Sequence, residues 1–181
     1  MVAVVLLVCL AEAAGAPSAP LFERMALVMG TRPDGDARVP LDMRVRAEVD
    51  CGGYVRKRID FAVESWDRLP AWLLVPKNLS GPAPAVLCPH PTSPDGKDVV
   101  VGLAGKEHRQ YAAELAERGY VTLAPDYPGF GEYVDTRRAL YDHGYASCSR
   151  KGIWNHRCCV DLLQSLPEVD GARIGCIGHS L

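Results

Sequence analysis

The sequence predicts an α/β fold in which helices cover both faces of a mostly parallel central sheet. Short, almost wholly apolar runs at residues 85–88, 121–124 and 172–177 are typical of buried strands. The segments 107–118 and 151–165 lie between these runs, and their apolar residues have helical spacing. A strand, a helix and a further strand in alternation favour parallel strands with helices on both faces.

Composition excludes several classes of protein. The chain has 181 residues, of which 48% are hydrophobic and 23% charged, as in a globular protein of one-domain size. The formal net charge is −2, and no run of five like charges occurs, so we expect no nucleic-acid partner. Seven scattered cysteines without a C-x-x-C pair indicate neither a disulfide framework nor a zinc site. We therefore expect no metal and no organic cofactor.

Residues 1–20 leave two alternatives open. Residues 2–11 are almost wholly apolar and precede a run of small residues at 13–16, as in a secretory signal peptide. No Lys or Arg precedes the apolar run, since the first basic residue is Arg24, which favours instead a disordered or helical N-terminus. The first alternative predicts a secreted or periplasmic protein and the second a cytoplasmic one. The apolar run is shorter than the roughly 20 residues that a membrane span needs.

Residues 40–181 form the predicted domain, which begins with antiparallel strands. Residues 43–50 and 54–64 flank Cys51-Gly52-Gly53 and are expected to pair around this turn. Residues 71–75 form the next strand, which Pro76 ends. A polar, proline-rich loop then leads to the buried strand 85–88.

The second part of the domain is expected to alternate between helix and strand. Gly119 ends the helix predicted at residues 107–118, and strand 121–124 follows. Pro167 ends the helix predicted at residues 151–165. Strand 172–177 begins after the turn dipeptide Asp170-Gly171.

Ser180 follows the last predicted strand and is the candidate nucleophile. Gly178-His179-Ser180-Leu181 gives the first four residues of Gly-x-Ser-x-Gly, the nucleophile elbow. In this turn between strand and helix, the serine hydroxyl lies above the edge of the sheet, and small residues flank it two positions away. Gly178 supplies the first small residue, and the second would be residue 182. We therefore expect the chain to be the front part of a longer domain.

The ends of the apolar strands supply the other candidate residues, because ligands of α/β sheets bind outside the carboxyl ends of the strands. Acyl transfer needs two N–H donors for the oxyanion, one from the residue after the serine and one from the loop after an earlier strand. Leu181 is the first donor. Pro91 has no N–H, so Thr92 is the predicted second donor. The alternative is that His90-Pro91 only ends a strand.

Residues 126–131 have the form D-x-x-G-x-G after a strand. A phosphate-binding loop is disfavoured here, because no lysine or helix start follows at the required positions. Phe130 and Tyr133 either line an acyl or sugar pocket or pack in the core. Gly96-Lys97-Asp98 is predicted to be a solvated turn. The candidate residues of the substrate pocket are His90, Asp126, Tyr127 and Phe130.

Segments 84–92, 111–133 and 173–181 together resemble the α/β-hydrolase superfamily, and within it the bacterial esterases related to dienelactone hydrolases and acetyl xylan esterases. The resemblance implies the N-terminal part of an α/β-hydrolase fold. It also implies a serine hydrolase that cleaves small-molecule carboxylic esters, of small acyl groups or of carbohydrates. Ser180 would attack the ester carbonyl, while the N–H groups of Leu181 and Thr92 would hold the oxyanion.

In that fold the acid and the histidine of the triad follow the serine in the chain, so they would lie beyond residue 181. We therefore expect this chain to be nearly inert alone, and residues 174–177 to form an unpaired, aggregation-prone edge. The alternatives are a peptidase or thioesterase of the same fold, or a non-catalytic binding protein. The sequence does not indicate an oligomeric state.

Overall fold

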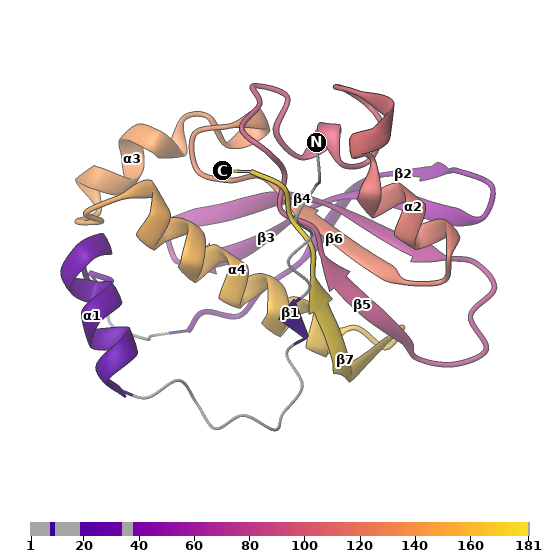
Figure 1. Ribbon diagram of the computed structural model, residues 1–181, viewed down its shortest axis with the longest axis horizontal. Helices are drawn as coiled ribbons and strands as arrows, with labels where there is room; N and C mark the ends of the chain where they lie inside the picture. The colour runs from indigo at the N-terminus through magenta and orange to yellow at the C-terminus, as the bar shows by residue number, and fades with distance from the viewer. Residues whose placement is uncertain (1–7, 10–18, 34–37, 181) are drawn as a thin grey trace.

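The computed structural model describes residues 8–9, 19–33 and 38–180, and within these residues seven strands form one sheet (Figure 1). The strands are β1 (Val8–Cys9), β2 (Arg44–Asp50), β3 (Tyr54–Glu64), β4 (Asp67–Pro76), β5 (Ala83–Leu87), β6 (Val121–Pro125) and β7 (Val169–Cys176). The helices are α1 (Ala19–Met29), α2 (Tyr111–Glu117), α3 (Thr136–Asp142) and α4 (Cys148–Ser165). The strand order is β1-β7-β5-β6-β4-β3-β2.

The α/β class is confirmed, but the antiparallel part of the sheet is larger than the predicted strand pair. Strand β5 is parallel to both β6 and β7, whereas β2, β3 and β4 form an antiparallel meander. Strand β4 is also antiparallel to β6. The expectation of a mostly parallel sheet therefore holds only for β5, β6 and β7. The turn Ser65-Trp66 joins β3 to β4 directly, and so short a connection allows only antiparallel neighbours.

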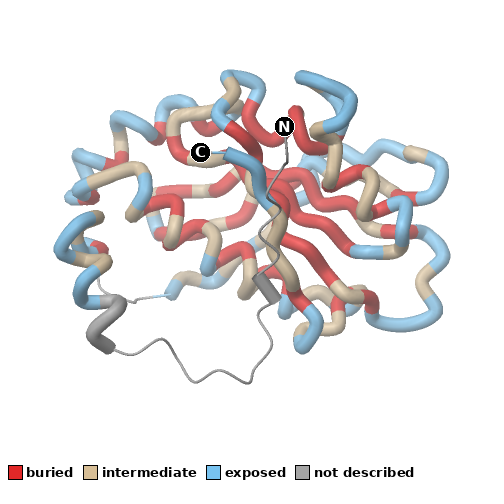
Figure 2. The backbone as a smooth tube through the Cα atoms, in the orientation of Figure 1, coloured by how far each residue is buried: buried red, intermediate tan, exposed pale blue. Residues whose placement is uncertain are grey.

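Alternating side chains divide the core into two layers, as the period of a strand requires. One face of the sheet packs against α4 and contains Leu73, Leu87, Leu123, Cys159, Leu162 and Leu163. The other face packs against α2 and contains Leu74, Val86, Cys88, Ala112 and Ala116. Figure 2 shows the buried strands as the centre of the molecule. The prediction of helices on both faces is confirmed.

The helix boundaries differ from the predicted ones for local reasons. Segment 107–118 begins with a short 3₁₀ turn, and α2 starts only at Tyr111, because Gln110 has a non-helical ψ of 41°. Gly119, with a φ of 91°, ends α2 as expected. Helix α4 starts at Cys148, before the predicted start, because the Ser147 hydroxyl accepts a hydrogen bond from the Arg150 N–H at 3.1 Å. Helices α1 and α3 were not predicted from the sequence.

Strand β7 corrects two expectations. It starts at Val169, so the predicted turn Asp170-Gly171 lies inside the strand, where the pairing with β5 shifts register between Ala83 and Ala85. Its outer edge, expected to be unpaired at residues 174–177, pairs at Gly175 and Cys176 with Cys9 and Val8.

The two alternatives for residues 1–20 fall mostly outside the described residues. Only β1 and the first residues of α1 are described within this segment. Among the described helices, none has both the length and the apolar character that crossing a membrane requires.

Candidate active site

Ser180 lies four residues beyond the end of β7 and has a positive φ. Its φ is 66°, and Asp42 is the only other non-glycine residue with a positive φ in the described part of the chain. This left-handed conformation costs a residue with a side chain about 1–2 kcal/mol and is characteristic of functional turns. An added Cβ at Gly178 would lie 3.7 Å from the Pro89 carbonyl oxygen, an ordinary contact. The φ of Ser180 is therefore unusual for a residue with a side chain, while Gly178 leaves room for a methyl group.

A cavity of about 210 Å³ opens beside Ser180. It is lined by Pro89, His90, Tyr127, Ser149, His156, Gly178, His179 and Ser180. These residues follow β5, β6 and β7 or belong to α4, so the fold brings three strand ends and one helix together. Of the predicted pocket residues, His90 and Tyr127 line the cavity, whereas Asp126 and Phe130 are not among its lining residues. Thr92, the predicted oxyanion donor, is not among them either.

Two residues of this cavity, Ser149 and His156, were not predicted from the sequence. Both lie on α4, seven positions apart, which places them on the same face of the helix two turns from each other. This spacing was the available signal, but it does not reveal which strand ends the helix face meets. Burial, and to a smaller extent the charge of the neighbouring His90, lowers the pKa of His156 to about 4. His156 is therefore neutral at pH 7.

His90 uses both of its ring nitrogens within the protein. Its Nε2 lies 3.0 Å from the Tyr127 backbone nitrogen and accepts that N–H. The proton of the neutral ring is then on Nδ1, which donates to the Pro91 carbonyl oxygen at 2.7 Å. Burial lowers the pKa of His90, which keeps the ring neutral. The predicted pocket residue His90 therefore contributes a wall to the cavity and offers substrate no free ring nitrogen.

Phe130 supports the histidine instead of lining the cavity. Its ring meets the His90 ring edge to face at a centroid distance of 5.8 Å and lies 6.3 Å from the Tyr127 ring. Tyr133, the other aromatic candidate, is buried in the core. For Tyr133 the core-packing alternative is therefore correct.

Asp126 is enclosed by two loops and does not face the cavity. Its carboxylate accepts hydrogen bonds from the backbone N–H groups of Lys97 and Glu132, at 2.8 and 3.1 Å. A Cβ added at Gly96 or Gly131 would lie 2.2 or 2.3 Å from Asp126 Oδ1, so only glycine fits at either position. Asp126, predicted to line the pocket, therefore joins the loops after β5 and β6.

The predicted solvated turn at Gly96-Lys97-Asp98 is wrong, because Lys97 is 1% exposed. Its ammonium group lies 2.7 Å from both Asp126 Oδ2 and Glu132 Oε1. Burial raises the pKa of Asp126, while the Lys97 charge opposes this shift. The two carboxylates come from 29 and 35 residues later in the chain, a separation that local patterns do not reveal.

Tyr111 was also missed, since its spacing in the sequence indicated only a packing role. Its hydroxyl donates to the Pro89 carbonyl oxygen and is hydrogen-bonded to the His179 backbone. The side chain thus ties the end of β5 to the residue before Ser180. Thr92 follows in the same loop and is exposed, whereas Leu181, the other predicted oxyanion donor, lies outside the described residues.

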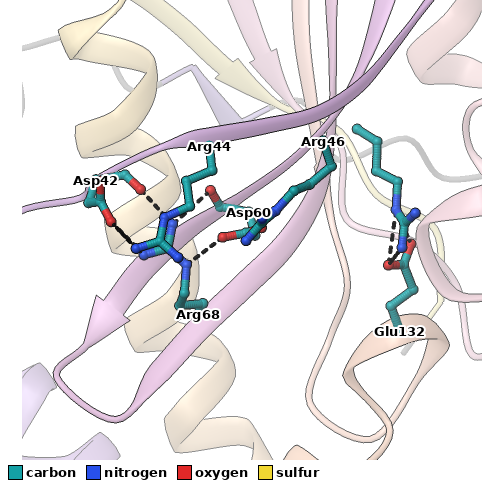
Figure 3. Close-up of polar contacts among 7 residues, drawn as sticks. Asp42, Arg44, Arg46, Asp60, Arg68 and Glu132 are labelled. Carbon is teal, nitrogen blue, oxygen red and sulfur yellow. Dashed lines mark hydrogen bonds and ion pairs between the residues drawn. The ribbon is translucent and has the colours of Figure 1, made fainter.

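A second cavity, of about 380 Å³, lies over β2, β3 and β4. Its charged residues belong to a surface network in which Asp60 pairs with Arg46 and Arg68, and Glu132 pairs with Arg58 (Figure 3). These guanidinium groups are already paired with carboxylates, and Ser180 does not line this cavity. The smaller cavity beside Ser180 is therefore the candidate active site.

Comparison with known proteins gives one relative by sequence. No family model matches the chain. YtaP of Bacillus subtilis, which is provisionally named a hydrolase, is 30% identical over 126 residues, covering 64% of this chain and 41% of YtaP. The chain thus spans less than half the length of this curated relative.

Solved structures give the fold. A protein from Bacteroides fragilis, provisionally named an acetyl xylan esterase, matches 89% of this chain and 46% of its own, with 19% identity and a TM-score of 0.69. A glucuronoyl esterase from Solibacter usitatus matches 94% of this chain and 56% of its own, with 19% identity and a TM-score of 0.60. An acetyl xylan esterase from Paenibacillus sp. R4 matches 93% and 54%, with 17% identity and a TM-score of 0.60. The chain has the α/β-hydrolase fold that its sequence resemblance implied.

Proposed function

We propose that the protein carrying this chain is a serine hydrolase that cleaves carboxylic esters of small acyl groups or of carbohydrates. The observation that carries this proposal is the left-handed φ of 66° at Ser180, four residues after the end of β7 and at the wall of a cavity. The names of the similar proteins support it, since they describe a hydrolase, acetyl xylan esterases and a glucuronoyl esterase.

In this proposal Ser180 Oγ attacks the ester carbonyl, and the carbonyl oxygen becomes negative. The N–H groups of Leu181 and Thr92 stabilise that oxygen, each contributing about 3 kcal/mol to lowering the barrier. The cavity of about 210 Å³ suits a small acyl group or a single sugar unit better than a long acyl chain.

The proposed reaction also needs a general base that takes the proton of the Ser180 hydroxyl. In the described residues Ser180 Oγ makes no hydrogen bond to a histidine, and in this fold the acid and histidine follow the serine in the chain. We therefore propose that residues beyond Leu181 provide both. The 181-residue chain alone should then lose several orders of magnitude in rate, because nothing takes the proton of the serine.

The test is turnover of p-nitrophenyl acetate by the whole protein, compared with its Ser180→Ala variant. We expect Ser180→Ala to lower kcat by about 10³-fold or more. Ser80→Ala is the matched control, because Ser80 is exposed in the loop before β5, does not line the cavity and should leave kcat unchanged. If the Ser180→Ala variant kept a kcat within a few-fold of the original, Ser180 would not be the nucleophile.

The proposed role of Thr92 depends on its backbone N–H, so the test removes this N–H. Thr92→Pro removes the N–H and should slow turnover about 10²-fold, whereas Thr92→Ala keeps the N–H and should not. Equal effects of the two substitutions would contradict an oxyanion role for the Thr92 N–H.

A further inference from the structure

One peptide group after β5 combines a fixed carbonyl with the proposed oxyanion donor. The carbonyl belongs to Pro91, and the N–H on the other side of the same bond belongs to Thr92. No peptide bond in the described residues is cis, so this C=O and this N–H lie in one plane and point in opposite directions. Any group that fixes the Pro91 carbonyl therefore also fixes the direction of the Thr92 N–H.

His90 is that group. Its Nδ1 lies 2.7 Å from the Pro91 carbonyl oxygen. The His90 ring cannot turn freely, because its Nε2 accepts the Tyr127 N–H at 3.0 Å and the Phe130 ring packs against it edge to face. The side chain is 2% exposed. The loop after β6 thus fixes the His90 ring, and the His90 ring fixes the Pro91–Thr92 peptide in the loop after β5.

The loop after β6 is a firm support for this ring. Asp126, which precedes Tyr127, accepts the Lys97 and Glu132 backbone N–H groups and pairs with the buried Lys97 ammonium. The Gly131 N–H also donates to the Pro94 carbonyl oxygen at 3.2 Å. Both loops are therefore joined on each side of the Pro91–Thr92 peptide.

We infer that His90 is a positioning residue of the oxyanion hole: its Nδ1–H orients and polarises the Pro91–Thr92 peptide so that the Thr92 N–H meets the developing oxyanion. A carbonyl that accepts a hydrogen bond makes the N–H of the same amide a stronger donor, through the cooperativity of hydrogen-bond chains. His90 neither transfers a proton nor binds substrate through its ring nitrogens. This inference rests on the proposed serine esterase activity.

The role predicts a specific kinetic effect. The N–H is needed most when negative charge develops on the carbonyl oxygen, so its loss lowers kcat more than it raises KM. A purely structural histidine would lower the amount of folded protein without changing the kcat of the molecules that remain folded.

Three substitutions distinguish the role of His90 Nδ1 as a donor from that of Nε2 as an acceptor. In His90→Asn the side-chain amide nitrogen takes the place of Nδ1 and keeps a donor to Pro91. In His90→Gln the amide reaches the place of Nε2, keeps an acceptor for the Tyr127 N–H and loses the donor. His90→Phe has neither. For p-nitrophenyl acetate and the whole protein, we expect kcat to fall 10- to 100-fold in His90→Gln and His90→Phe, and less than fivefold in His90→Asn, with KM nearly unchanged.

Asn155→Leu is the matched control. Asn155 is 1% exposed and hydrogen-bonds the Lys151 ammonium at 2.9 Å and the Tyr133 hydroxyl at 3.3 Å, but it does not line the cavity. Its loss should lower stability like that of His90 and leave kcat unchanged. Equal kcat values for His90→Gln and His90→Asn, or an equal fall in Asn155→Leu, would overturn the inference.

A measurement on the unsubstituted 181-residue chain needs neither turnover nor a folded variant. Imidazole ¹⁵N shifts of His90 should show the neutral tautomer with the proton on Nδ1. The Nε2–H tautomer would overturn the inference, because Nδ1 would then have no proton to donate to Pro91. The result that would contradict the proposed function is a different one, namely turnover that survives the Ser180→Ala substitution.

Discussion

The Lys97 ammonium lies 2.7 Å from Asp126 Oδ2, and both side chains are almost fully buried. This pair joins the loop after β5, which carries Thr92, to the loop after β6, which carries Tyr127. Glu132 extends the network to the surface, where it pairs with Arg58 of β3 (Figure 3). The wall of the candidate active site is thus held by charges that do not face the cavity.

Lys97→Met should therefore be strongly destabilising. It removes the cation and leaves the Asp126 carboxylate buried without its charged partner, which costs about 3–5 kcal/mol of unfolding free energy. Urea denaturation followed by circular dichroism measures the loss. Arg58→Ala is the control, because the Arg58–Glu132 pair is exposed and should contribute less than about 1 kcal/mol. Similar losses in both variants would contradict a special role for the buried pair.

Gly131→Ala should destabilise the protein by about 2–4 kcal/mol. The new Cβ would lie 2.3 Å from Asp126 Oδ1, and Gly131 has a φ of 56°, which disfavours any residue with a side chain. Gly53→Ala offers the comparison, because no atom lies within 4 Å of its added Cβ and its φ is not positive. Thermal unfolding should separate the two, and a melting temperature of Gly131→Ala as high as that of Gly53→Ala would show that the loop relaxes.

Ser180→Gly should be more stable than Ser180→Ala by about 1 kcal/mol. Glycine adopts a φ of 66° without steric cost, whereas alanine keeps the Cβ that strains the turn. Both variants lack the hydroxyl, so their comparison isolates the backbone. Equal unfolding free energies in urea would mean that the turn at Ser180 is not strained.

Stability should fall as the pH falls from about 6.5 to about 4, in part through His156. Its pKa is lowered from 6.5 to about 4 in the folded protein, so between these values the unfolded chain binds a proton that the folded chain does not. The contribution is fully present above pH 6.5 and amounts to at most about 3 kcal/mol. His156→Phe should show a shallower fall in unfolding free energy between pH 7 and pH 4.5. An unchanged pH dependence in this variant would assign the effect to other groups.

Local patterns were sufficient where the physical cause is local. The paired strands around Cys51-Gly52-Gly53 and the stop at Gly119 follow from side-chain period and turn residues, and the strand that leads to Ser180 follows from its apolar residues. The sequence by itself therefore determined the α/β class and the succession of the main strands along the chain, and it indicated Ser180 as the candidate nucleophile. It also placed His90 and Tyr127 at strand ends that line the cavity.

Tertiary structure alone decided what those strand ends meet. Lys97 is buried because carboxylates 29 and 35 residues later close over it, and His156 lines the cavity because α4 packs beside β7. The spacing of residues in the sequence predicts neither the burial of Lys97 nor the position of His156 in the cavity wall. Both depend on which helices and strands are neighbours in the fold. Spacing fixes the face on which a side chain lies, but only the packed sheet decides whether that face meets solvent, a charge or a substrate cavity.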